Sequence, residues 1–142
     1  MITENLRDFV EDVNYAFVAT ADAAGTPHLA VGKGLHIPDP GHLVFDAWFC
    51  RRTLENLGRN PRVAVAVVAV PSGTGYQFIG TVAEIAEAGI LDGFAPEAEP
   101  TGMPQVCWCL KVRVEEVLEF SHGIHSDIPL SLDEYPTGTG ER

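Results

Sequence analysis

The chain has 142 residues, of which 46% are hydrophobic and 20% charged, and its formal net charge is −11. This length suits one folded domain, and the composition is typical of a globular protein rather than a disordered one. The negative charge disfavours nucleic acid and anionic lipid as partners, because both carry negatively charged phosphates. No apolar run approaches the roughly 20 residues that a membrane-spanning helix needs.

The N-terminal residues and the cysteines indicate a cytoplasmic protein. Residues 1–5 carry no basic segment that leads into an apolar one, so we expect no signal peptide. The three cysteines, Cys50, Cys107 and Cys109, are an odd number, and two of them lie only two positions apart. Because this is a poor disulfide framework, a reducing compartment is the natural location.

The first third of the chain predicts a helix followed by strands. Residues 3–14 place apolar side chains at helical spacing behind Thr3, a suitable N-cap. The period then changes to that of strands, interrupted by turns at residues 22–25 and 38–41. Gly25 stands where the first turn requires a positive φ. The predicted strands here cover residues 15–21, 27–37 and 42–48.

The rest of the chain predicts three more strands and short helices. A short helix over residues 51–58 ends before Asn60-Pro61, and a second is expected over 86–94. Residues 62–70 are nearly all Val and Ala, which favours a central strand covered on both faces. Gly80 marks a bulge or a close backbone approach. The strands cover residues 62–70, 76–85 and 105–120, with a loop at 95–104 and a tail at 121–142 that we expect to be partly mobile.

Six antiparallel strands in one small domain would leave exposed sheet edges unless the sheet closes. Closing it into a barrel removes those edges. We therefore expect a mainly β protein, a six-stranded antiparallel β-barrel, with residues 1–142 forming a single domain.

A basic cluster follows the third predicted strand. Only nine Lys and Arg are present, and four of them lie within residues 51–62. Arg51, Arg52 and Thr53 occupy the first turn of the predicted helix, where free backbone N–H groups and the helix dipole favour an anion such as phosphate. Two alternatives remain open: Thr53 is only an N-cap, or the arginines are solvated residues that offset an acidic surface.

The order and spacing of several short motifs resemble the pyridoxamine 5'-phosphate oxidase-like superfamily of FMN-binding split β-barrels, and most closely its short bacterial FMN-binding members. The resemblance covers roughly residues 5–120. The motifs that carry it are Gly25-x-Pro27-His28, Leu43-Val44-Phe45, Arg52-Thr53-Leu54-x-Asn56-Leu57-x-x-Asn60-Pro61-Arg62-Val63-Ala64-Val65, Ser72-Gly73-Thr74-Gly75-Tyr76 and Gly80-Thr81-Val82.

This resemblance implies FMN as the cofactor and a homodimer that holds it at the interface. Arg52 and Thr53 fall on the family's phosphate-binding pair, with Arg51 as a neighbouring candidate. The backbone of the strand Phe45, Asp46, Ala47, Trp48 and Phe49 is similar to the one that lines the flavin ring. Lys33 falls near the cofactor, where some members have an aromatic residue, and Gln77 is expected to reach the ring from the partner subunit.

The resemblance implies an FMN-dependent oxidoreductase or flavin electron carrier acting on a small-molecule electron donor or substrate. One alternative is the same barrel holding the deazaflavin F420 or haem, with His122 or His125 as the axial ligand. Another is a non-catalytic dimer with a vestigial flavin site, which the lysine at position 33 favours. No protein acid or base is evident, so the catalytic residues are not assigned.

Three other features have a structural interpretation that we prefer. Cys107 and Cys109 with His122 and His125 suggest a metal site, but zinc sites usually have wider cysteine spacing, and we expect no metal. Trp48 and Trp108 are expected in the core or an interface. His28 and His36 alternate with apolar residues and are expected to be surface or cross-strand residues.

Overall fold

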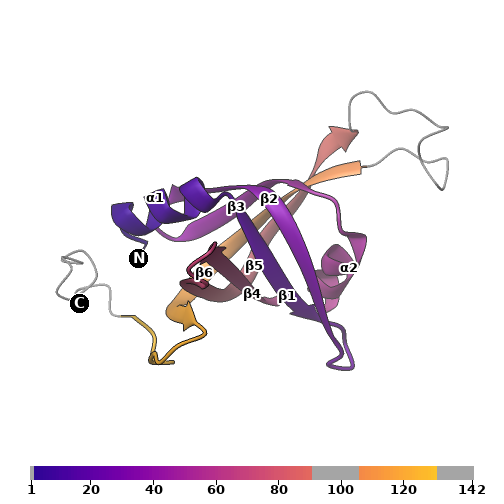
Figure 1. Ribbon diagram of the computed structural model, residues 1–142. Helices are drawn as coiled ribbons and strands as arrows, with labels where there is room; N and C mark the ends of the chain where they lie inside the picture. The colour runs from indigo at the N-terminus through magenta and orange to yellow at the C-terminus, as the bar shows by residue number, and fades with distance from the viewer. Residues whose placement is uncertain (1, 91–105, 131–142) are drawn as a thin grey trace.

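A computed structural model describes residues 2–90 and 106–130 of the chain, which form six strands and two helices (Figure 1). No helix in these two ranges has the length and apolar character to cross a bilayer. In chain order the elements are α1 (Glu4–Val13), β1 (Tyr15–Ala21), β2 (Pro27–Asp39), β3 (His42–Trp48), α2 (Arg51–Arg59), β4 (Arg62–Ala69), β5 (Thr74–Ile90) and β6 (Val106–Ser121).

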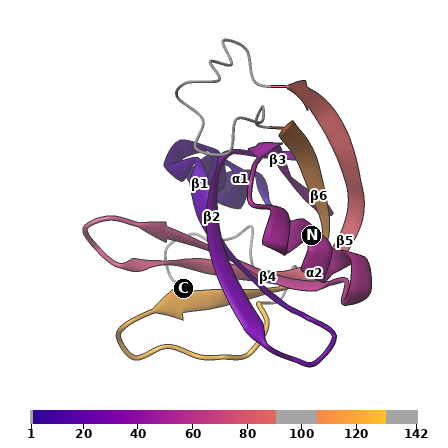
Figure 2. The same cartoon turned by 90° about the vertical axis from the view of Figure 1, so that its right-hand side faces the viewer.

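The strands form a closed antiparallel barrel in the order β1-β2-β3-β6-β5-β4, which confirms the predicted fold class. Closure depends on the pairing of β1 with β4 over Phe17–Ala66, Val18–Val65 and Ala19–Ala64. β5 and β6 form the longest pair, and their far ends extend beyond the barrel as a two-stranded ribbon (Figure 1). The two helices lie on opposite sides of the barrel, as a quarter turn of the view also shows (Figure 2).

Local sequence determines both ends of α1. The Thr3 hydroxyl accepts a hydrogen bond from the Leu6 backbone N–H at 3.2 Å, so the predicted N-cap is confirmed. Asn14 ends the helix in the left-handed conformation with φ of 66°, which asparagine tolerates. Its side-chain oxygen also accepts a hydrogen bond from the Leu35 backbone N–H of β2 at 2.9 Å, which fastens the helix end to the barrel.

The core combines the inward side chains of all six strands with residues of both helices. Leu6 and Val10 of α1 are buried, as are Thr53, Asn56 and Leu57 of α2. The Asn56 side-chain amide donates a hydrogen bond to the buried Thr20 hydroxyl of β1 at 3.0 Å. This bond satisfies two buried polar groups and fixes how α2 lies against the barrel.

Most of the predicted elements agree with the structure. The helices and the first three strands match within about two residues, the usual uncertainty of element boundaries. Gly25 has the expected positive φ of 90°. The register shifts at Gly80, where a Cβ atom would collide with the Arg113 backbone carbonyl of β6, so the predicted close approach is confirmed.

Two predictions differ from the structure. Residues 86–90 were expected to start a helix but continue β5, because they pair with residues 106–109 of β6. β4 is not covered on both faces within one chain: its burial alternates, and Ala64, Ala66 and Val68 on the outward face are half-buried. The expected loop at 95–104 and the tail beyond residue 130 lie outside the described residues.

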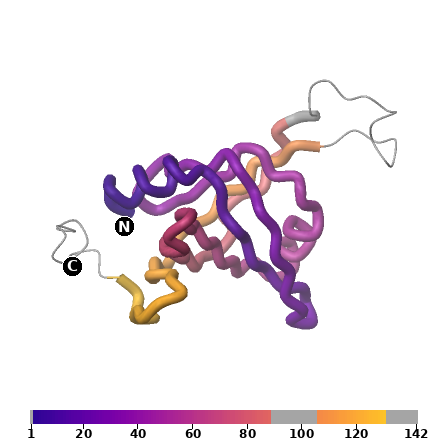
Figure 3. Tube along the Cα trace, in the orientation of Figure 1, coloured from indigo at the N-terminus to yellow at the C-terminus, as the bar shows by residue number. Residues whose placement is uncertain are grey.

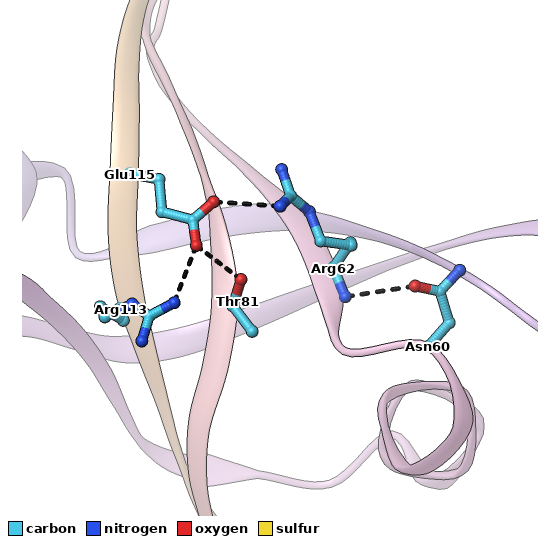
Figure 4. Close-up of polar contacts among 5 residues, drawn as sticks. All are labelled: Asn60, Arg62, Thr81, Arg113 and Glu115. Carbon is cyan, nitrogen blue, oxygen red and sulfur yellow. Dashed lines mark hydrogen bonds and ion pairs between the residues drawn. The ribbon is translucent and has the colours of Figure 1, made fainter.

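A charged cluster joins β4, β5 and β6 on the outside of the barrel (Figure 4). Glu115 accepts a hydrogen bond from the Thr81 hydroxyl at 2.7 Å and pairs with Arg113 at 3.0 Å and Arg62 at 3.2 Å. The Thr81 hydrogen bond, followed by that from Arg113, holds the pKa of Glu115 below its ordinary value of 4.5. Because the carboxylate is solvent-screened, we expect a small contribution to stability.

Replacing Glu115 by Gln is expected to lower the melting temperature slightly at pH 7 and to have no effect at strongly acidic pH. A lowered folded-state pKa stabilises the fold above the ordinary pKa, and this stabilisation is lost as the pH falls below 4.5 through the folded value. Thermal unfolding monitored by circular dichroism across this pH range measures the difference. The matched control is Glu116→Gln, an exposed neighbour; equal effects of the two variants at pH 7 would contradict the assignment.

Candidate functional site

The N-terminus of α2 has an unusual arrangement of charge. The N-cap residue Cys50 makes no side-chain capping hydrogen bond, and the first turn contains no acidic residue. Arg51 and Arg52 stand there instead, although the positive end of the helix dipole disfavours cations. Uncapped N–H groups, the dipole and two guanidinium groups together favour a bound anion.

A surface cavity of about 830 Å³ lies along the side of α2. Arg52, Asn56 and Arg59 contribute from one face of the helix, since positions i, i+4 and i+7 lie on the same side. The opposite wall is the β1–β2 hairpin, residues 22–28, which lies on the same side of the barrel as α2 (Figure 3). The cavity therefore joins a basic helix face to a turn that is remote from it in sequence.

Two buried side-chain atoms in this region have no hydrogen-bond partner among the described residues. One is Nδ1 of His28, which lines the cavity, and the other is Oγ1 of Thr53, whose residue is fully buried on α2. Unsatisfied buried polar atoms cost free energy and are rare in native proteins. A ligand in the cavity could satisfy Nδ1 of His28, whereas Thr53 does not line the cavity.

Two basic and two acidic residues line the cavity, but they are not equally available to a ligand. Arg52 and Arg59 form no ion pair with any described carboxylate, so their donors are free. Of the two acidic residues, Asp22 is occupied: its carboxylate accepts hydrogen bonds from the backbone N–H groups of Ala24 and Thr26, both at 2.9 Å. The Thr26 backbone hydrogen bond is the main cause that lowers the pKa of Asp22. Glu55 is the other acidic residue.

The side chains of the strand at residues 45–49 divide between the core and the surface. Phe45 and Trp48 are fully buried and pack edge to face with ring centroids 4.9 Å apart, so only their backbone is available to a ligand. Asp46 is exposed and pairs with Nδ1 of His36 at 3.2 Å. Ala47 is half-buried, and Phe49 is 38% exposed.

Lys33 and Gln77 do not line the cavity beside α2. Lys33 is exposed on β2, opposite Tyr15 on one side and Ala47 on the other. Gln77 lines a second cavity of about 490 Å³ on the outward surface of β1, β4 and β5. One chain therefore does not bring Gln77 and Arg52 to the same cavity.

The second cavity lies in an exposed apolar face of the barrel. Leu29 is 65% exposed, Val31 58% and Phe17 40%, which is unusual for a group of large apolar side chains. We define the apolar face by its outward residues Tyr15, Phe17, Leu29, Val31, Ala64, Ala66, Val68 and Phe120.

The structure adds His28 and Arg59 to the predicted site residues. His28 was expected to be a surface or cross-strand residue, and it does pair across the hairpin with Thr20. However, its side chain also lines the cavity next to α2. The place of His28 in the motif Gly25-x-Pro27-His28 could have indicated a site residue. Its position in the cavity beside α2 depends on the tertiary fold.

The arrangement of Cys107 and Cys109 with His122 and His125 as one metal site is not supported. The cysteines start β6, whereas the histidines follow its end, more than twelve residues away along an extended strand. Nε2 of His122 contacts the Ser72 carbonyl at 3.3 Å, and Nε2 of His125 pairs with Asp127 at 3.3 Å. Within residues 2–90 and 106–130, no group of three or more His, Cys, Asp or Glu is placed to hold a metal ion.

Comparison with known proteins gives one family match and several similar structures. Residues 2–119 match the family model described as pyridoxamine 5'-phosphate oxidase. HupZ from Group A Streptococcus is 25% identical with a TM-score of 0.66, covering 89% of this chain and 99% of that one. No curated protein matches.

Two further similar structures are less than 25% identical and show the fold alone. An FMN-binding protein from Syntrophomonas wolfei is 16% identical with a TM-score of 0.62, covering 85% of this chain and 87% of that one. A structure described as an F420 reductase is 21% identical with a TM-score of 0.58, covering 82% of this chain and 98% of that one.

Replacing Phe45 by Ala is expected to lower the free energy of unfolding by about 3–5 kcal/mol, because it leaves a cavity beside Trp48 in the core. Replacing Phe49, which is partly exposed, is expected to cost less than about 1 kcal/mol. Urea unfolding of the two variants gives both values. A small effect of Phe45→Ala would mean that its ring is not part of the core.

Proposed function

Because the chain belongs to the pyridoxamine 5'-phosphate oxidase family, whose model it matches over most of its length, we propose that it binds FMN and acts as an oxidoreductase or flavin electron carrier. The observation that carries this proposal is the first turn of α2, which is uncapped, basic and next to a buried hydroxyl without a partner. The described residues fit a phosphate monoester at this point.

Arg52, Arg51 and Thr53 would hold the phosphate. An arginine binds a phosphate with two parallel hydrogen bonds, and the α2 backbone N–H groups add donors that need no reorganisation. The phosphate would also give Oγ1 of Thr53 the partner that it lacks within the chain. His28 and Arg59, across and along the same cavity, are two further donors for the sugar-phosphate end.

The flavin ring would lie against the backbone of residues 45–49. Burial of Phe45 and Trp48 keeps this segment rigid, and Lys33 stands opposite Ala47, within reach of the ring's polar edge. The flavin, when bound, supplies the capacity to accept and donate electrons. The chain would orient it and exclude water, and the electron donor or substrate would be a small molecule.

A second copy of the chain would cover the apolar face and complete the site. An exposed patch of this kind is typical of a protein–protein interface. Gln77 lies in this face, so dimerisation would bring the Gln77 of one chain toward a cofactor held by the other. All three cysteines are free, which supports a function in the reducing cytoplasm.

Replacing Arg52 by Ala is expected to weaken FMN binding by about ten- to hundredfold, because it removes charge-assisted hydrogen bonds to the phosphate. Fluorescence quenching of FMN on titration with purified protein measures this, after an absorption spectrum has established retention by the unaltered chain. Arg7→Ala is the matched control, since Arg7 pairs with Glu4 on α1, on the other side of the barrel.

Replacing Thr53 by Val tests the phosphate assignment more specifically than replacing Arg52. The substitution keeps the side-chain volume and removes the unpartnered hydroxyl, so it should stabilise the free protein slightly while weakening FMN binding. Unchanged FMN affinity in both variants would remove the phosphate assignment. A folded protein that retains no FMN would instead favour F420, recognised by its fluorescence, haem, recognised by its Soret band, or a vestigial site.

Leu29→Glu is expected to convert the dimer to a monomer, because it places a charge in the centre of the apolar face. Ile128→Glu is the control: Ile128 is 71% exposed but lies outside this face. Sedimentation or size-exclusion chromatography with light scattering gives the mass of each variant. A dimeric Leu29→Glu variant would exclude this face as the interface.

A further inference from the structure

Cys107 and Cys109 form a pair of thiols on one side of β6. Alternate residues of a strand point to the same face, and the intervening and following residues, Trp108 and Leu110, point toward the core. Both cysteines are free and only half-buried, so the pair is accessible from solvent.

An irregularity in β3 lies directly beside the pair. Phe45 pairs with Leu110 and Trp48 with Trp108, so two residues of β3, Asp46 and Ala47, face the single position of Cys109. Such a bulge leaves backbone groups outside the regular ladder. The Asp46 carbonyl oxygen is 3.8 Å from Sγ of Cys107 and accepts its hydrogen bond, which orients this thiol next to its neighbour.

The surroundings of the pair are acidic overall. Asp46 of β3 and Glu84 of β5 lie close enough to raise the pKa of Cys109, after burial as the main cause, and Lys111 is the nearby cation that opposes them. His36 of β2 pairs with Asp46. A site with two carboxylates and one ammonium group favours a bound cation over an anion.

The distance between the two thiols favours a metal ion that bridges them over a direct disulfide bond. Alternate Cα atoms along a strand are roughly 6.6 Å apart, at the upper limit for a disulfide. Two collinear metal–sulfur bonds of about 2.3 Å place the two sulfurs roughly 4.6 Å apart. An extended strand accommodates this separation more easily than it accommodates a disulfide. The described residues supply no third ligand, so they do not by themselves form a four-coordinate zinc site.

We propose that Cys107 and Cys109 bind one soft monovalent cation, Cu(I), as a two-coordinate bis-thiolate. Soft thiolate ligands select Cu(I), which is stable with only two of them in a linear arrangement. Each thiol loses its proton to solvent, two Cu–S bonds form, and no electron is transferred. The resulting net charge of −1 is partly offset by Lys111. The site adjoins the segment proposed above to line the flavin ring, because the Asp46 backbone belongs to both.

The test is anaerobic titration of the full, reduced chain with Cu(I) in competition with the colorimetric chelator bicinchoninate. The unaltered chain is expected to withhold one Cu(I) per chain. Cys107→Ser and Cys109→Ser should each weaken binding by at least about tenfold. Cys50→Ser is the matched control and should bind as the unaltered chain does, because Cys50 is the N-cap of α2 and is not part of the pair on β6.

Circular dichroism of each variant first establishes that it is folded, and serine is nearly isosteric with cysteine at these half-buried positions. Three results would each overturn the proposal: release of all Cu(I) to the chelator by the unaltered chain, undiminished binding by the Cys107→Ser, Cys109→Ser double variant, or equal weakening by Cys50→Ser. The last would indicate independent thiols rather than a pair.

Discussion

Three residue pairs between β1 and β4 close the barrel, and the apolar face and the cavity beside α2 depend on them. Their inward members, Val18 and Val65, meet in the core, while Phe17 and Ala66 meet on the outside and make the apolar face continuous. Without this pairing both strands would have open edges. Closure also holds the β1–β2 hairpin against α2, and the hydrogen bond from Asn56 to Thr20 joins the two. The cavity that His28 and Arg52 line lies between them.

The distribution of charge explains how an acidic chain can favour an anion at one place. Arg62 and Arg113 are neutralised in part by Glu115 on the β4–β6 surface (Figure 4). Arg51 and Arg52, by contrast, have no described carboxylate partner and stand at a helix end that already carries partial positive charge. The local potential at α2 therefore differs in sign from the net charge of the chain.

β3 connects the two proposed sites without merging them. Its inward residues, Phe45 and Trp48, stabilise the core, and its backbone leads into α2. Its outward bulge at Asp46 contacts the thiol of Cys107. One side of β3 packs in the core, so its backbone is rigid. Such a strand positions the groups at both of its ends precisely enough for binding, whereas a loop of the same length would not.

The sequence by itself determined the features that depend on neighbouring residues. The N-cap Thr3, the turn at Gly25 and the basic first turn of α2 were all predicted, because capping, turn conformation and local charge depend on neighbouring residues. The closed barrel was predicted from the need of six antiparallel strands to cover their edges, and the family resemblance agreed with it.

Only the tertiary structure decided the features that depend on residues far apart in the chain. Residues 86–90 have a composition that allows a helix, but pairing with residues 106–109 makes them a strand. His28 reaches the α2 cavity, and Gln77 lies on the apolar face instead, because barrel closure sets which surfaces meet. Cross-strand hydrogen bonds and packing exceed local propensity in such cases, so their outcome cannot be read from a short window of sequence.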